Sequence, residues 1–153
     1  MSDQDIAVHD LASLPVAVMR RQVRVGELPR VVPECCGLVW SALRAQGVKG
    51  GRHVAIYWDT GIRLEVGVEA LEPFDEGDDL VRSATPAGLT VRSTHFGPYR
   101  ELGKTHEAIQ RWCAARGHAL AGPSWEIYAH WAPEWNEQPA LIRTDVFYQV
   151  ATG

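Results

Sequence analysis

The order strand, helix, strand, strand is predicted twice along this chain, and this repetition constrains the fold more than any other sequence feature. In the first half, an apolar run at 16–25 precedes a proline-opened helix that runs to about Gln46. Two further strands are predicted at 54–58 and about 63–69, and Thr60-Gly61 marks a tight turn between them. The apolar residues of the helix recur at helical spacing: Val32, Cys36, Val39 and Leu43.

The second half repeats the order. A strand at 89–95 precedes a helix from about 99 to 116, and strands at 124–130 and 141–150 follow. An acidic connection at 70–85 joins the halves, and its last residues are expected to pair as a strand. One stripe of the second helix is made of Leu102, His106, Ile109 and Cys113.

Two halves of the same order indicate a duplication. The predicted class is α+β, with βαββ modules at about 16–69 and 80–150 in a single domain, 16–150, after a disordered or extended stretch at 1–15. The helices are expected on one side of a sheet, which leaves the other side free to be concave. Aligning Ile56-Tyr57 with Ile127-Tyr128 makes Ala55 the counterpart of Glu126, so only one half carries an acid.

Composition excludes several functions. The formal net charge of −4 argues against a nucleic-acid surface, which needs clustered Lys and Arg. No apolar run approaches the roughly 20 residues of a membrane-spanning helix, and the acidic N-terminus does not resemble a secretory signal. Three cysteines make no disulfide framework, and six scattered histidines lack metal-ligand spacing. We therefore expect a reduced, cytoplasmic protein without metal or cofactor, and its oligomeric state stays open.

Residues 122–131 place one acid inside the most aromatic stretch of the chain. Because side chains alternate along a strand, Glu126 and Tyr128 share one face and Trp125 and Ile127 share the other. A carboxylate enclosed beside a phenol ring favours an apolar cation, which supplies opposite charge and a π partner together. The alternative is that Glu126 faces solvent on a half-exposed strand, and spacing alone leaves both open.

Several motifs resemble the GyrI-like small-molecule-binding family, also known as the effector-binding domain of multidrug-sensing transcription activators. The segments 95–102 (His-Phe-Gly-Pro-Tyr-Arg-Glu-Leu), 122–128 (Gly-Pro-Ser-Trp-Glu-Ile-Tyr) and 141–148 carry the resemblance together with Trp112, and 55–59 is a weaker counterpart in the first half. The resemblance covers roughly residues 15–150 and implies two βαββ modules related by pseudo-twofold symmetry. It also implies an antiparallel sheet and a ligand cleft between the modules.

The same resemblance implies a function. Members bind bulky aromatic, often cationic compounds, and a Glu in the strand matching 124–130 meets the cation, a position that Glu126 occupies. The sensor proteins carry a helix-turn-helix domain ahead of this fold, and the 15 residues here are too few for one. We therefore expect small-molecule partners, no membrane and no direct binding of nucleic acid.

These arguments predict which residues line the cleft. Tyr57, Tyr128 and Tyr148 are expected in the cleft, with packing across the sheet as the alternative. Trp131 and Trp135 lie in a loop that either lines a ligand or is simply anchored by them. His106, on the apolar stripe, is expected to be a satisfied core histidine. The full set of predicted ligand-binding residues is Glu126, Tyr128, Tyr57, Tyr148, Trp131, Phe96 and His95.

Three functions remain open, and binding is favoured over catalysis. The first is a stand-alone multidrug-binding protein, linked to drug resistance, that holds lipophilic cations. The second is a hydrolase that opens the cyclopropane ring of alkylating natural products, as some relatives do. In that enzyme Glu126 activates water and Tyr128 or Tyr57 donates a hydrogen bond to the carbonyl that gathers charge. The third is a protein-binding module that inhibits DNA gyrase.

Overall fold

The computed structural model describes residues 6–59, 63–77 and 79–151, and it is an α+β fold built on one eight-stranded antiparallel sheet. The sheet order is β1-β6-β8-β7-β3-β4-β2-β5. The strands and α-helices, in chain order, are β1 (Ala7–Leu11), β2 (Pro15–Gln22), α1 (Leu28–Ala45), β3 (Gly50–Tyr57), β4 (Arg63–Ala70), β5 (Val81–Ala84), β6 (Gly88–Phe96), α2 (Leu102–Ala115), β7 (Leu120–Tyr128) and β8 (Arg143–Val150).

The predicted fold class is confirmed by this arrangement. One module is β2-α1-β3-β4 and the other is β6-α2-β7-β8, and they join where β3 pairs with β7 at the centre of the sheet. In that antiparallel pair Ala55 is the partner of Glu126, and Tyr57 is the partner of Ser124. Of the aligned positions, Ala55 and Glu126 therefore face each other across the join, whereas Tyr57 and Tyr128 pair with other residues.

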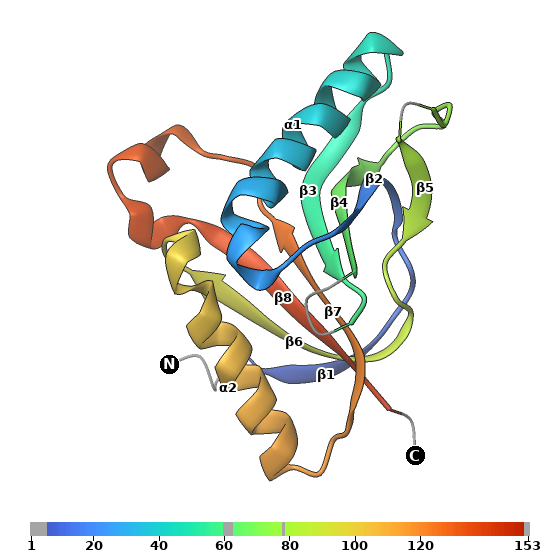
Figure 1. Ribbon diagram of the computed structural model, residues 1–153. Coiled ribbons are helices and arrows are strands. Elements are labelled where there is room, and N and C mark those ends of the chain that lie inside the picture. The colour runs from blue at the N-terminus through green and yellow to red at the C-terminus, as the bar shows by residue number, and fades with distance from the viewer. Residues whose placement is uncertain (1–5, 60–62, 78, 152–153) are drawn as a thin grey trace.

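Both helices cover the same face of the sheet, as Figure 1 shows. On α1 the buried positions are Val31, Cys35, Val39 and Leu43, which recur every four residues. Val32 and Cys36, which belong to the predicted stripe, are only half-buried beside that core. The buried stripe of α1 is thus rotated from the predicted one, and this rotation turns Val32 and Cys36 toward the edge of the core.

The opposite face of the sheet is filled, whereas the sequence pattern left it free to be concave. Trp125 and Phe147 stack there with ring centroids 5.2 Å apart, in a cluster that includes Val16, Val54 and Ile127. The opposite face is closed because the short connection between β1 and β2 draws the two edges of the sheet together. β1 and β2 lie near opposite edges of the sheet but are joined by only three residues, which span about 14 Å at most. The two edges must therefore approach each other.

Two hydrogen bonds extend the β2–β5 pairing into the adjoining connections. The backbone N–H of Leu14 donates to Thr85 Oγ1 at 2.8 Å, and the N–H of Thr85 donates to the Leu14 carbonyl at 3.0 Å. These bonds link the β1–β2 connection to the β5–β6 connection. The predicted pairing at the end of the 70–85 connection is present as β5, which pairs with β2.

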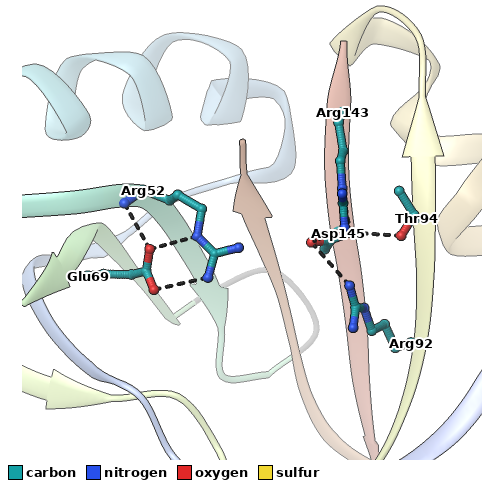
Figure 2. A network of polar contacts seen from close by, with 6 residues as sticks. All are labelled: Arg52, Glu69, Arg92, Thr94, Arg143 and Asp145. Atoms are coloured by element: carbon teal, nitrogen blue, oxygen red, sulfur yellow. Dashed lines mark hydrogen bonds and ion pairs between the residues drawn. The ribbon is translucent and has the colours of Figure 1, made fainter. Parts of the chain in front are cut away.

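Polar contacts also occupy the opposite face, as Figure 2 shows. Arg52 forms a bidentate pair with Glu69, at 2.7 and 3.0 Å. The buried Asp145 accepts a hydrogen bond from Thr94 at 2.8 Å and lies 3.5 Å from the guanidinium of Arg92. The charged groups Arg52, Glu69, Arg92 and Asp145 of this face are therefore paired.

Part of the N-terminal stretch is ordered in the sheet. Residues 7–11, expected to be disordered or extended, form β1 and pair with β6. The predicted Thr60-Gly61 turn lies outside the described residues. Among those that are described, no helix is long and apolar enough to cross a membrane.

Candidate functional site

Glu126 lies on β7 at the centre of the sheet, on the face that the helices cover. Its exposed fraction is 4%, so it does not face solvent. The alternation of β7 places Trp125 and Ile127 in the apolar cluster of the opposite face. Tyr128, on the same face as Glu126, packs against the cores of both modules. The acid is therefore at the junction between the modules.

Three side chains donate hydrogen bonds to this buried carboxylate. The Tyr57 hydroxyl donates to Oε1 at 3.2 Å, and the Tyr128 hydroxyl donates to the same oxygen. His106 Nε2, from α2, lies 2.6 Å from Oε2. A buried charge is costly unless it is hydrogen-bonded or paired, and here both oxygens have partners.

His106 continues the network away from the carboxylate. Its Nδ1 lies 2.6 Å from the hydroxyl of Tyr148, and Gln110 Nε2 donates to that hydroxyl at 3.1 Å. When Tyr148 donates its one proton to Nδ1, the imidazole is neutral and its Nε2–H points at Glu126. The direction of each hydrogen bond from Tyr148 through His106 to Glu126 is then fixed.

The phenol groups around Glu126 are held in their protonated form. Burial raises the pKa of Tyr57, and the charge of Glu126 raises it further. The same two causes, burial first, raise the pKa of Tyr128 well above its ordinary value. Burial is also the main cause of the raised pKa of Tyr148. These hydroxyls are therefore hydrogen-bond donors and not anions at neutral pH.

The α1 side of the site is apolar and neutral. Val32 and Cys36 are half-buried and pack with the rings of Tyr57 and Tyr128 in one core cluster. Burial raises the pKa of the Cys36 thiol to about 12, so it carries no charge at neutral pH. Tyr99, which is 44% exposed, meets the ring of Tyr128 edge-on at 5.6 Å and forms an outer rim.

The remaining predicted residues lie apart from this group. His95 is buried and bonds Thr105 Oγ1 through Nδ1 at 2.9 Å and the Pro98 carbonyl through Nε2 at 3.2 Å. It therefore ties β6 to the start of α2. Phe96 is 59% exposed at the end of β6. Trp131 is half exposed and packs edge-on against Trp135, with centroids 5.3 Å apart. Ligand binding by these residues stays a prediction.

The carboxylate is enclosed by its own donors. Two surface cavities, of about 360 and 240 Å³, are lined by other residues, the larger by Phe74 and Arg82 and the smaller by Trp40 and Leu43. Because Glu126 is only 4% exposed, a ligand that reaches it must move the aromatic side chains around it. Within the described ranges, no group of three or more His, Cys, Asp or Glu is placed to hold a metal ion.

His106 is the site residue that sequence reasoning missed, because its stripe is otherwise apolar and indicated a core histidine. Its side chain is 19% exposed and contacts the acid directly. One signal was present in the sequence. Gln110 follows His106 by four residues, so two polar side chains share the helix face that covers the sheet. Such a pair on an apolar stripe indicates a polar partner below it.

Comparison with known proteins gives a family. Residues 4–151 match the model of the GyrI-like small molecule binding domain. No curated protein sequence matches the chain at a significant level.

Solved structures with the same fold are similar to this chain at low identity. The C-terminal domain of EcmrR is 20% identical with a TM-score of 0.74, and the match covers 97% of this chain and 98% of that domain. In an EcmrR–DNA complex, a chain 19% identical with a TM-score of 0.75 is matched over 97% of this chain and 57% of its own length.

Two further structures show the fold at a TM-score of 0.60. SAV2435 bound to tetraphenylphosphonium is 12% identical, with 95% of this chain and 93% of that chain covered. A hydrolase from Listeria innocua is 11% identical, with 96% and 92% covered.

Proposed function

We propose that this chain, which belongs to the GyrI-like small-molecule-binding family, holds bulky aromatic, lipophilic cations with Glu126 as the group that recognises charge. The observation that carries the proposal is a carboxylate only 4% exposed, between two helices and beneath the rings of Tyr57 and Tyr128. It supports a binding role because a buried carboxylate is costly unless it is compensated, and a cationic ligand can supply the opposite charge.

The burial of aromatic surface and the attraction between a cation and a tyrosine ring both favour a flat or bulky aromatic cation. Aromatic surface removed from water contributes roughly 25 cal/mol per Å². A cation over a tyrosine ring adds about 0.5 to 2 kcal/mol. Neither contribution demands one ligand shape, so several unrelated compounds can be held, which is the basis of multidrug binding. The chain's net charge of −4 also favours cations over anions.

The existing hydrogen bonds set the cost of binding. Tyr57, Tyr128 and His106 already satisfy the carboxylate, so a ligand must replace or share these bonds. A phosphonium or quaternary ammonium ion cannot donate a hydrogen bond, but it can compensate the charge while the phenols keep their bonds. A structure of SAV2435 with tetraphenylphosphonium supports this ligand class for the fold.

The test is a titration of rhodamine 6G, a lipophilic aromatic cation, followed by fluorescence anisotropy. Glu126→Gln keeps the volume and removes the charge, so affinity should fall by about 1 to 3 kcal/mol, or roughly 5- to 150-fold. Glu137→Gln is the matched control, since Glu137 is exposed, and should leave affinity unchanged. Equal affinity of wild type and Glu126→Gln would show that the acid does not recognise the dye.

A hydrolase is the second candidate, and the pairing of Glu126 with His106 favours it. A carboxylate beside an imidazole can accept a proton from water while the water oxygen bonds to a cyclopropane carbon. The ring C–C bond then breaks, and its electron pair moves to a conjugated carbonyl that a protonated Tyr57 or Tyr128 stabilises by a hydrogen bond.

Mass spectrometry distinguishes the two candidates. Incubation of the protein with a cyclopropane-bearing alkylating compound should leave the compound unchanged if the chain only binds it. Addition of one water in the wild type, and not in Glu126→Gln, would instead establish the hydrolase. The similar fold of a hydrolase from Listeria innocua supports this second candidate.

A further inference from the structure

We infer that His106 and a cationic ligand compete for the charge of Glu126, so that cation affinity falls when His106 is protonated. The inference rests on the proposed function and adds its regulation. It makes His106 the residue that sets the pH range in which the site accepts a cation.

The geometry places His106 where the ligand's charge is needed. Its Nε2 lies 2.6 Å from Glu126 Oε2, and the two side chains are 19% and 5% exposed. Among the ion pairs of the residues that the structure describes, this is the one that involves Glu126. Histidine ordinarily changes charge between about pH 5 and 8, which no other side chain does without perturbation.

The other titratable groups around His106 and Glu126 carry no charge near neutral pH or are exposed to solvent. Tyr148 on β8, Tyr57 on β3, Tyr128 on β7 and the Cys36 thiol on α1 all have a raised pKa because of burial, and they stay neutral near pH 7. Tyr99, at the rim, also has a raised pKa. The charged residues of α2 near His106 are exposed to solvent: Lys104, Glu107 and Arg111.

The network accommodates both charge states of the imidazole. A neutral His106 accepts the Tyr148 proton at Nδ1, over 2.6 Å. A protonated His106 donates from Nδ1, and the Tyr148 hydroxyl then turns its own proton toward Ser124, its ladder partner on β7. Protonation therefore costs no hydrogen bond.

The charge of His106 determines how strongly Glu126 attracts a cationic ligand. With a neutral imidazole, the Glu126 carboxylate is hydrogen-bonded but faces no opposite charge from His106, and a cation stabilises it. With a protonated imidazole, the pair is already neutral, and a second cation would be repelled. Cation binding to the protonated pair therefore expels up to one proton, and affinity falls by as much as about tenfold per pH unit wherever His106 is protonated. A neutral ligand lacks this dependence.

Calorimetry with tetraphenylphosphonium and a neutral triaryl phosphine oxide, over about pH 5.5 to 8.5, tests the inference. In the wild type we expect phosphonium affinity to rise with pH, with proton release seen as a heat that depends on the buffer. Phosphine oxide affinity should stay level. His106→Gln keeps a donor to Glu126 but cannot be protonated, so its phosphonium affinity should lose the slope and match the wild-type value at high pH.

His118→Gln is the control, because His118 stacks on Trp112 beyond the end of α2 and should leave the slope intact. The same slope in His106→Gln would assign the proton to Glu126 itself and overturn the inference. Phosphonium binding without any pH dependence in the wild type would overturn it as well, while the proposed function would stand. An absence of phosphonium binding at every pH would overturn both.

Discussion

Ala55 lies directly opposite Glu126 in the antiparallel pair of β3 and β7, at equivalent positions of the two modules. The pseudo-twofold relation thus sets a methyl group against a carboxylate. Ala55 is fully buried, so there is no room beside the acid for a longer side chain. The two modules share one acid, and the small residue opposite it preserves space for the rings of Tyr57 and Tyr128.

A pair of substitutions at Ala55 separates volume from charge. Ala55→Val and Ala55→Asp add side chains of similar size, and overpacking should cost each variant about 1 to 3 kcal/mol of unfolding free energy. Ala55→Asp should cost more at pH 7, because two carboxylates would then face each other in a buried ladder. Urea denaturation measures both. The excess cost of Asp should shrink at low pH, and equal stability of the two variants at pH 7 would contradict the predicted charge repulsion.

The sequence predicted the central features of the fold because they depend on local periodicity. The alternation of 122–131 predicted that Glu126 and Tyr128 share a face, and β7 has that arrangement. The repeated element order predicted two modules, and the alignment that set Ala55 against Glu126 agrees with the pairing of β3 and β7. These patterns involve neighbours in sequence, so no tertiary information was needed.

The features that the sequence did not predict depend on contacts between residues far apart in the sequence. The role of His106 is defined by Glu126 and Tyr148, which follow it by 20 and 42 residues, so its own helix could indicate only a core position. The closure of the opposite face arises from the short β1–β2 connection acting across the whole sheet. The apolar pattern of a single strand does not indicate how far apart β1 and β2 lie in the sheet.

Alanine substitutions at two glycines should change the stability of the protein in opposite directions. A Cβ at Gly67 on β4 would lie 1.8 Å from the Ala17 carbonyl oxygen of β2, so Gly67→Ala should separate these strands and cost at least about 1 to 3 kcal/mol. Gly37 lies on the exposed side of α1 with open space around it. Gly37→Ala should therefore stabilise the protein by roughly 0.5 to 1 kcal/mol. Thermal unfolding measures both, and a tolerated Gly67→Ala would mean that β2 and β4 are not so closely packed.

The Arg52–Glu69 pair of Figure 2 predicts a pH dependence of stability. Hydrogen bonds from Arg52 lower the pKa of Glu69, so the folded state binds fewer protons than the unfolded state. This contribution is present above the ordinary Glu pKa of about 4.3 and is lost as pH falls through the lowered value. Glu69→Gln should therefore reduce the free energy of unfolding at pH 7, by about 1 to 2 kcal/mol.

Urea denaturation of the two proteins at pH 7 and near pH 3 checks this prediction, since the difference between them should disappear in acid. Glu107→Gln is the control, because its side chain is 71% exposed and lies 4.0 Å from Arg111. A Glu69→Gln effect of equal size at both pH values would assign the loss to packing and not to charge.

The most direct measurement of the central claim couples the charge of the ligand to the charge of Glu126. Tetraphenylphosphonium and a neutral triaryl phosphine oxide are titrated at high pH into wild type and Glu126→Gln, which gives four affinities. Recognition of charge by Glu126 predicts that the substitution weakens the phosphonium roughly 5- to 150-fold and changes the affinity for the phosphine oxide little. Equal weakening of both ligands, or of neither, would show that Glu126 does not recognise a cation.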